Sequence, residues 1–352
     1  MASMFALCRE SHGSAVQQLL RALCAVAEGA SVCSGVGAGA HSHTAAALCV
    51  SAALGDAGRR LSAMGGRAGM PRSLGSVLGC WVMRFLGGFR GVESRVIPTP
   101  KIRSTSNGIA LTRDGSTLLV SDCHGASQRV HTFDATTGAY LRAVGSAGTG
   151  PLQFRMPCQI WVASDDHVFV VEDANDRVQE LTPQLDFHGF IGAGQLRNPA
   201  GVCANREIVA VSEFIHCRIS VFCRGDGALL RRVGSIGHSD GQLNHPMGLC
   251  FENRTGYIAV ADHGNYRISV FRADGEFVRH VGVGQLRHPI GVACTAFDEL
   301  VVADWDNSRV VVFGADGELM HAMHSGRFTG VATHGATIYA QLCTDEKCVV
   351  FT

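Results

Sequence analysis

From residue 81 onward, short apolar runs return at a regular interval, separated by residues that favour turns. Four segments begin alike, with a glutamine, an apolar residue and, three positions later, a proline. These prolines lie 42, 47 and 43 residues apart: Pro157, Pro199, Pro246 and Pro289. Each proline opens an apolar run, and a second apolar run then ends in an acidic residue. Self-similarity at such a period indicates an array of one supersecondary unit.

An acidic residue and an arginine mark the middle of each repeat. The acids are Asp122, Glu172, Glu213, Asp262 and Asp304. Five residues after the last four come Arg177, Arg218, Arg267 and Arg309, whereas Arg129 follows Asp122 by seven, which requires a two-residue insertion. Each arginine is followed by a four-residue strand pattern that ends in an aromatic residue or leucine. An Asp-Gly pair, a strong hairpin signal, follows in three repeats, and a short RxVG segment ends the unit.

Each repeat therefore predicts four short strands and no helix, which is typical of a blade of a β-propeller. The sixth repeat lacks a fourth strand, but an RxVG-like segment precedes the first repeat at Arg84–Gly87. We expect residues Trp81–Gly87 to pair with Cys348–Phe351, because this pairing removes the edges that an open array exposes. The predicted fold is all-β: a six-bladed propeller of four-stranded blades, closed by an N-terminal strand, over residues 81–352.

Residues 1–80 differ from this pattern, since Ala, Gly and Ser make up 39 of the 80. Residues 14–28 read as a short amphipathic helix, with Ser14 as the N-cap and Gly29 as the stop. We expect residues 1–80 to be a low-complexity, partly helical extension, separate from the propeller. Three interpretations stay open: a disordered extension, an over-extended reading frame, or a targeting segment, because the region is rich in arginine and poor in acids.

Composition excludes several classes. The chain has 30 basic and 30 acidic residues, so its net charge predicts no polyanionic partner. Fourteen cysteines occur without any CxxC pair, the basic unit of zinc knuckles and RING-type sites. The longest apolar stretch near the N-terminus is too short to span a membrane. We expect a soluble monomer with free thiols in the cytoplasm, or in an organelle if residues 1–80 act as a transit peptide.

The repeats over residues 81–352 resemble those of the NHL family of six-bladed propellers. The resemblance is strongest in the segment His245–Gly282, and weakest in the sixth repeat, where Leu342 replaces the acid and Lys347 the arginine. It implies a recognition module similar to the substrate- or RNA-binding part of tripartite-motif and related RING ubiquitin ligases. A minority of relatives are enzymes with a metal site in the central channel.

We expect the ligand to bind where the loops between blades meet the loops between second and third strands. The ring has 24 basic and 27 acidic residues, so arginines gathered in these loops are a local signal. They suit RNA phosphates or an acidic peptide, with rings available for stacking. The alternative is that arginine simply occupies exposed loops. The candidate residues are Arg155, Arg197, His245, Arg287, His288, Arg327, His124, Phe214, His263 and Trp305.

Two residues of the second blade depart from the repeat. Gln159 replaces the glycine of the first strand, and Trp161 stands in a column otherwise made of alanine and cysteine. They are candidates for a channel-lining site, with local repacking as the alternative. In the same column, Cys203 and Cys250 read as small core residues. The repeated acid–arginine pairs read as structural ion pairs, since paired catalytic carboxylates require one blade to differ from the rest.

The sequence contains no HxH or HExxH motif in the propeller, so we assign no metal ligands and no cofactor. Histidines from different blades converging on the axis need no local motif and stay open as an alternative. The leading hypothesis is a non-catalytic recognition module for protein or RNA, connected to ubiquitin-dependent protein turnover through a separate ligase subunit. The rival is a metal-dependent lyase or hydrolase with its site in the channel.

Overall fold

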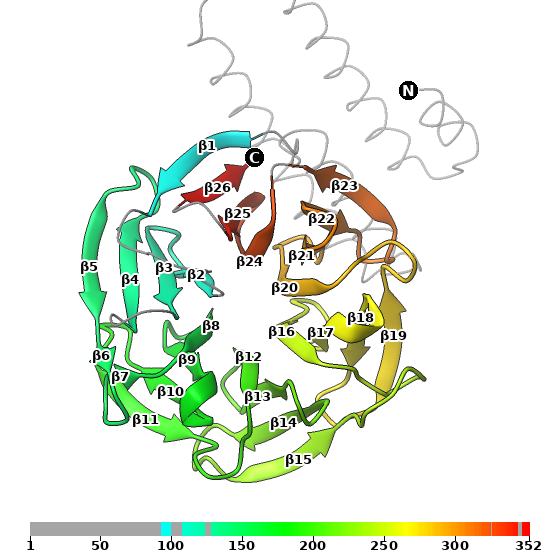
Figure 1. Ribbon diagram of the computed structural model, residues 1–352, viewed down its shortest axis with the longest axis horizontal. Coiled ribbons are helices and arrows are strands. Elements are labelled where there is room, and N and C mark those ends of the chain that lie inside the picture. Colours follow the sequence, from blue (N-terminus) through cyan, green and yellow to red (C-terminus); the bar gives the residue numbers. More distant parts are fainter. Residues whose placement is uncertain (1–92, 100–107, 124–127, 325, 344–346) are drawn as a thin grey trace, which may run out of the picture. The chain divides into compact units, whose positions relative to one another are not determined.

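The computed structural model describes residues 93–99, 108–123, 128–324, 326–343 and 347–352. These residues form six four-stranded antiparallel sheets arranged around a central axis, as the repeats predict (Figure 1). Within each sheet the strands run in chain order from the axis outward, except that the outer strand of the sixth blade comes from the start of the ring. The all-β, six-bladed fold is thus confirmed.

Each blade consists of four short strands that follow the same order. Blade one contains β2 (Ile109–Leu111), β3 (Thr117–Asp122), β4 (Arg129–Asp134) and β5 (Tyr140–Val144). Blade two contains β8 (Pro157–Val162), β9 (Val168–Glu172), β10 (Arg177–Leu181) and β11 (Phe187–Ile191). Blade three contains β12 (Pro199–Ala204), β13 (Ile208–Glu213), β14 (Arg218–Cys223) and β15 (Leu229–Val233).

The other three blades continue the series. Blade four contains β16 (Pro246–Phe251), β17 (Ile258–Asp262), β18 (Arg267–Phe271) and β19 (Phe277–Val281). Blade five contains β20 (Pro289–Cys294), β21 (Leu300–Asp304), β22 (Arg309–Phe313) and β23 (Leu319–Met323). Blade six contains β24 (Phe328–His334), β25 (Thr337–Leu342), β26 (Lys347–Phe351) and β1 (Glu93–Pro98). Short additions are the parallel pair β6 (Ser146–Ala147) and β7 (Gln153–Phe154), and the 3-10 turns η1 (Asp173–Asn175) and η2 (His263–Asn265).

An N-terminal strand does close the ring, but the predicted residues were wrong. The outer neighbour of β26 is β1, not Trp81–Gly87, which lie outside the described residues. Ile97 of β1 pairs with Cys348, in the register in which Val233 pairs with Ile219 in blade three. The RxVG motif misled the prediction because only its apolar residue faces the core, and Ile97 supplies that residue without the motif; it is 1% exposed.

The core lies between neighbouring blades. At or next to its last residue, the third strand of every blade carries a side chain that is at most 1% exposed: Phe133, Leu181, Phe222, Phe271, Phe313 and Phe351. The inner strands instead carry small residues, because they crowd toward the axis. Cys203 and Cys250 are fully buried among apolar neighbours, as expected for small core residues. The cysteines of the described residues are free thiols.

The predicted boundary between residues 80 and 81 and the predicted helix at residues 14–28 lie outside the described residues. Within the described part of the chain, no helix has the length and apolar character needed to cross a membrane.

Candidate functional site

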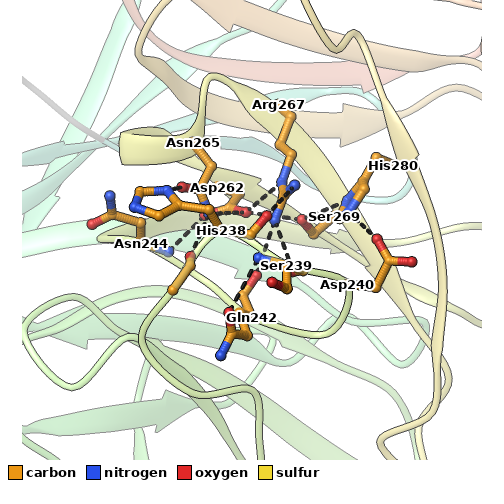
Figure 2. A network of polar contacts seen from close by, with 11 residues as sticks. His238, Ser239, Asp240, Gln242, Asn244, Asp262, Asn265, Arg267, Ser269 and His280 are labelled. Atoms are coloured by element: carbon orange, nitrogen blue, oxygen red, sulfur yellow. Dashed lines mark hydrogen bonds and ion pairs between the residues drawn. The ribbon is translucent and has the colours of Figure 1, made fainter.

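The acid–arginine pairs hold the loops that connect the blades. In blade four, Arg267 Nε donates to Asp262 Oδ2 at 2.9 Å, and the same carboxylate accepts bonds from the Asn244 backbone N–H, Asn265 and Ser269 (Figure 2). The rest of the guanidinium donates to backbone carbonyls of the preceding loop at His238, Ser239 and Gln242. Equivalent ion pairs of 2.7 Å form at Glu172–Arg177, Glu213–Arg218 and Asp304–Arg309. The structural interpretation of these pairs is confirmed.

The first repeat departs from this arrangement. Asp122 and Arg129 face each other across β3 and β4, so the two-residue insertion is confirmed. Arg129 is exposed, however, and the buried Asp122 lies 3.7 Å from His131 Nε2.

Long and short loops between blades alternate around this part of the ring. Loops 145–156 and 234–245 are five residues longer than loops 192–198 and 282–288. The long loops wrap the arginine, since Arg177 also donates to the carbonyls of Thr149, Gly150 and Gln153. Beside the short loop of blade five, Gln285 is the one residue of the described chain whose backbone carbonyl accepts a bond from Arg309. A hollow of about 600 Å³ opens there, and its lining includes Tyr266, Arg287, Asn307, Arg309 and His324.

Rings from three blades meet beside this hollow. Phe214, after β13, lies 4.6 Å from His245 and 6.5 Å from His263 between ring centroids. His263 lies 4.6 Å from His288, and Tyr266 stands edge-on to His288 at 4.7 Å. We call these five residues the ring row. Four of the five were singled out from the sequence, and the blade order brings them together although 74 positions separate the first from the last.

Cations border the ring row. Arg287 and His288 both approach Asp306, with His288 Nδ1 2.6 Å from Oδ2. The pKa of Asp306 is below its ordinary value, first because of the hydrogen bond from His288 and further because of the positive charges of Arg287 and Arg327. Arg327 lies with its guanidinium carbon 5.7 Å from the ring centre of Trp305. Asp306 therefore connects the ring row, through His288, with Arg327 and the neighbouring ring of Trp305.

The remaining candidates are placed differently. Arg197 pairs with Asp176 at 2.8 Å, and Arg155 is exposed on the loop before blade two, so both lie nearer blades two and three. His124 lies outside the described residues. We define the loop face as the ring row together with Arg155, Arg197, Arg287, Trp305 and Arg327.

Burial affects one member of the ring row. Desolvation lowers the pKa of His263 from its ordinary value, and the neighbouring His288 and His245 lower it further through like charge. The carbonyl of Pro289, 3.2 Å from His263 Nδ1, acts in the opposite direction. A neutral imidazole packed against other rings is suited to contact with planar groups.

The two channel candidates serve packing. Gln159 Nε2 donates to the carbonyl of Leu249 at 2.9 Å, and its Oε1 accepts the backbone N–H groups of Val202 and Leu249. A Cβ at Gly201 would lie 2.6 Å from that Oε1, so the glycine in blade three makes room for the glutamine of blade two. Trp161 donates to the carbonyl of Ala204 at 2.8 Å and packs against apolar clusters of neighbouring blades.

The cavity beside Gln159 has a volume of about 40 Å³ and is mostly apolar. Among the described residues that line it, the polar side chains are those of Gln159 and Thr329, together with the thiol of Cys158. The lining that the structure describes thus contains no imidazole or carboxylate. Local repacking is the interpretation that these contacts support.

Replacing Gln159 by Ala should lower the free energy of unfolding by about 1–3 kcal/mol, because backbone groups of β12 and β16 lose their partner. Chemical denaturation measures the change. Gln184→Ala is the control, since Gln184 is exposed in a turn of the same blade. Equal stability of the two variants would contradict the bridging role.

One residue of the loop face and two aspartates that pair with its arginines do not stand out in the sequence. Tyr266, Asp176 and Asp306 carry no repeat-wide signature, and they become recognisable only through their contacts with His288, Arg197 and Arg287. A weak signal existed, because each lies in a turn between second and third strands, where propellers vary.

Comparison with known proteins gives partial matches. No model of a protein family matches the chain. Protein brain tumor of Drosophila melanogaster is 31% identical over 101 residues, which are 28% of this chain and 10% of that protein. RING finger protein nhl-1 of Caenorhabditis elegans is 38% identical over 73 residues, or 19% of this chain and 7% of that protein. Protein wech of Drosophila melanogaster is 39% identical over 59 residues, or 17% and 7%. The matched segments thus span a tenth or less of these relatives.

Solved structures share the fold. A streptogramin B lyase has a TM-score of 0.53 at 12% identity, covering 70% of this chain and 79% of that one. A chain of a nidogen/laminin complex has a TM-score of 0.53 at 17% identity, covering 65% and 85%. At such identities the likeness concerns the fold alone. The repeats, the closed ring of six blades and the curated relatives agree, and they support the resemblance of this chain to the six-bladed β-propellers of NHL-repeat proteins.

Proposed function

We propose that this propeller is a recognition module that binds a polypeptide segment on its loop face. The observation that carries the proposal is the ring row, which brings Phe214, Tyr266 and three histidines together from blades three to five. Aromatic side chains and arginines dominate the energetics of protein interfaces. The hollow beside Arg287 and Arg309 offers a concave place for a side chain of the partner.

Charge on the loop face supports a partner with acidic and planar groups. The side chains of Arg197 and Arg287 are 64% and 67% exposed, so their pairing with Asp176 and Asp306 leaves donors directed to solvent. An incoming carboxylate can share these donors, because a guanidinium has five N–H groups. The paired aspartates hold the arginines in place before a partner arrives.

Single-stranded RNA is the second candidate, and the combination of clustered rings, on which bases can stack, with arginines favours it. The two candidates differ in salt dependence. Binding to RNA releases counterions from phosphates, so its affinity falls steeply as salt rises. Binding of a peptide through rings and a few ion pairs has a shallower dependence.

The rival function, a lyase or hydrolase with a channel metal, finds no support in the described lining of the channel, which is apolar around Gln159. The likeness to a streptogramin B lyase concerns the fold alone. We further propose that the module selects targets for ubiquitin-dependent turnover through a separate ligase subunit. The name of the relative nhl-1, a RING finger protein, supports this connection.

A crosslinking pull-down that scores both protein and RNA partners tests the binding function. Arg287→Ala combined with Phe214→Ala should weaken capture at least tenfold, which corresponds to about 1.4 kcal/mol. Arg254→Ala is the matched control, because Arg254 is also 67% exposed and also pairs with an aspartate, Asp298, but lies in the β16–β17 turn at the other end of the strands.

The outcomes separate the candidates. Loss of a protein crosslink in the double variant supports the hypothesis of a polypeptide partner. Loss of an RNA crosslink, together with a steep salt dependence of binding, supports the hypothesis of an RNA partner. If capture is the same for the double variant, Arg254→Ala and the unchanged chain, the loop face is not the binding surface.

A further inference from the structure

A second cluster of polar side chains lies in blade two, at the ends of the strands opposite the loop face. His167 precedes β9, Glu180 lies in β10 and His188 lies in β11. One ligand atom from each of these three residues lies within 4.8 Å of the other two. The three residues are 13 and 8 positions apart in the sequence, so no short motif marks them.

Adjacent strands fix this arrangement. Glu180 pairs with Phe169 on one side and Gly189 on the other, which places it between the histidines that precede those residues. The rings of His167 and His188 stand edge-to-face, with centroids 5.0 Å apart. The cluster therefore rests on strand pairing rather than on a flexible loop, as a preorganised site requires.

One atom of the cluster lacks a satisfactory partner. His167 Nδ1 is buried and lies 2.8 Å from Glu180 Oε1, yet it makes no hydrogen bond within the described residues. Buried polar atoms are normally paired. An imidazole nitrogen next to a carboxylate oxygen, without a hydrogen bond between them, is the arrangement in which a cation satisfies both.

The surrounding charges suit a cation. Arg224 from blade three contacts Glu180 Oε1 and Asp165 Oδ2, each at 2.8 Å. Two carboxylates around one guanidinium leave a net negative charge while both histidines are neutral. His167 Nδ1 and Arg224 both approach Oε1 of Glu180, and Arg224 holds this carboxylate from outside the cluster.

We propose that His167, Glu180 and His188 form a zinc site. Two imidazoles and one carboxylate are a ligand set that Zn²⁺ takes in proteins, with the fourth position left to water. Zinc–ligand bonds of about 2.0–2.2 Å require a rearrangement of ligand atoms that now lie up to 4.8 Å apart. The exposed ring of His188 is the part free to swing inward. This site is distinct from the loop face and from the central channel.

The test uses the full chain, stripped with a chelator and titrated with zinc chloride alone. Isothermal titration and metal analysis should find one zinc fewer in the variant His167→Gln/His188→Gln than in the unchanged chain. Subtraction is needed because the chain also has 14 cysteines and other histidines. Cobalt in place of zinc should give visible d–d bands without a thiolate charge-transfer band from this site, since no sulfur is among its ligands.

Two single variants keep the test decisive. His188 is exposed, so His188→Gln should retain the melting temperature of the zinc-free protein while weakening zinc binding at least tenfold. His334→Gln is the control, because His334 is exposed in blade six, away from the cluster. The proposal is overturned if the double variant binds as much zinc as the unchanged chain, or if His334→Gln removes as much as His188→Gln does.

Discussion

Replacing Ile97 by Ala should lower the free energy of unfolding by about 2–5 kcal/mol, the cost typical of truncating a buried isoleucine. Ile97 is 1% exposed and packs in the cluster that joins blade six to blade one, beside Leu118 and Phe133. The effect is large because β1 is the strand that completes blade six and thereby closes the ring. Denaturant titration followed by circular dichroism measures it.

Val96→Ala is the matched control, because Val96 is the next residue of the same strand and is 41% exposed. Its cost should stay within about 0.5 kcal/mol. A chain that begins at residue 89 keeps β1 and should melt like the full chain, whereas one that begins at residue 100 should melt far lower. Equal melting of these two chains would show that the ring does not depend on β1.

Replacing Asp262 by Asn should cost about 3–5 kcal/mol, because it leaves the guanidinium of Arg267 buried without its counter-charge. Asp262 is fully buried and Arg267 is 8% exposed, and both anchor loop 234–245 through the contacts in Figure 2. We expect a fall in the denaturation midpoint and faster amide exchange at the Asn244 N–H, which donates to Asp262.

Glu276→Gln is the control for Asp262→Asn. Glu276 and Arg272 form an ion pair in the same blade, but their side chains are 59% and 47% exposed. Water screens such a pair, so its loss should leave stability nearly unchanged. If Asp262→Asn lowered the free energy of unfolding no more than Glu276→Gln does, the repeated acid–arginine pairs would contribute little to stability.

The blades were predictable from the sequence because every repeat forms the same strands and turns from similar residues. The second strands are apolar runs buried on both faces, Asp-Gly turns connect the third and fourth strands in three blades, and the acid–arginine spacing recurs in four blades. A sequence feature that recurs in several repeats can be recognised even where one repeat departs from it. The same redundancy identified Cys203 and Cys250 as core residues.

Features that occur once were harder to predict. The closing strand was assigned to residues 81–87 by its RxVG motif, whereas the strand that closes the ring needs only one buried apolar residue in the right register, Ile97. Gln159 stood out as an exception, but its bonds to Val202 and Leu249 depend on how blades two, three and four converge. Neither relation has a fixed spacing in the chain.

The sequence by itself determined the number of blades, their strands and the loops in which ligand-contacting rings and arginines gather, because local periodicity and turn chemistry specify each unit. Only the tertiary structure decided which of those side chains meet. The ring row joins Phe214 to His288, Asp306 joins Arg287 to the surroundings of Arg327, and His167 meets His188 through β9, β10 and β11. Contacts between neighbouring blades and loops set the first two relations, and strand pairing within blade two sets the third, so no short spacing in the chain marks any of them.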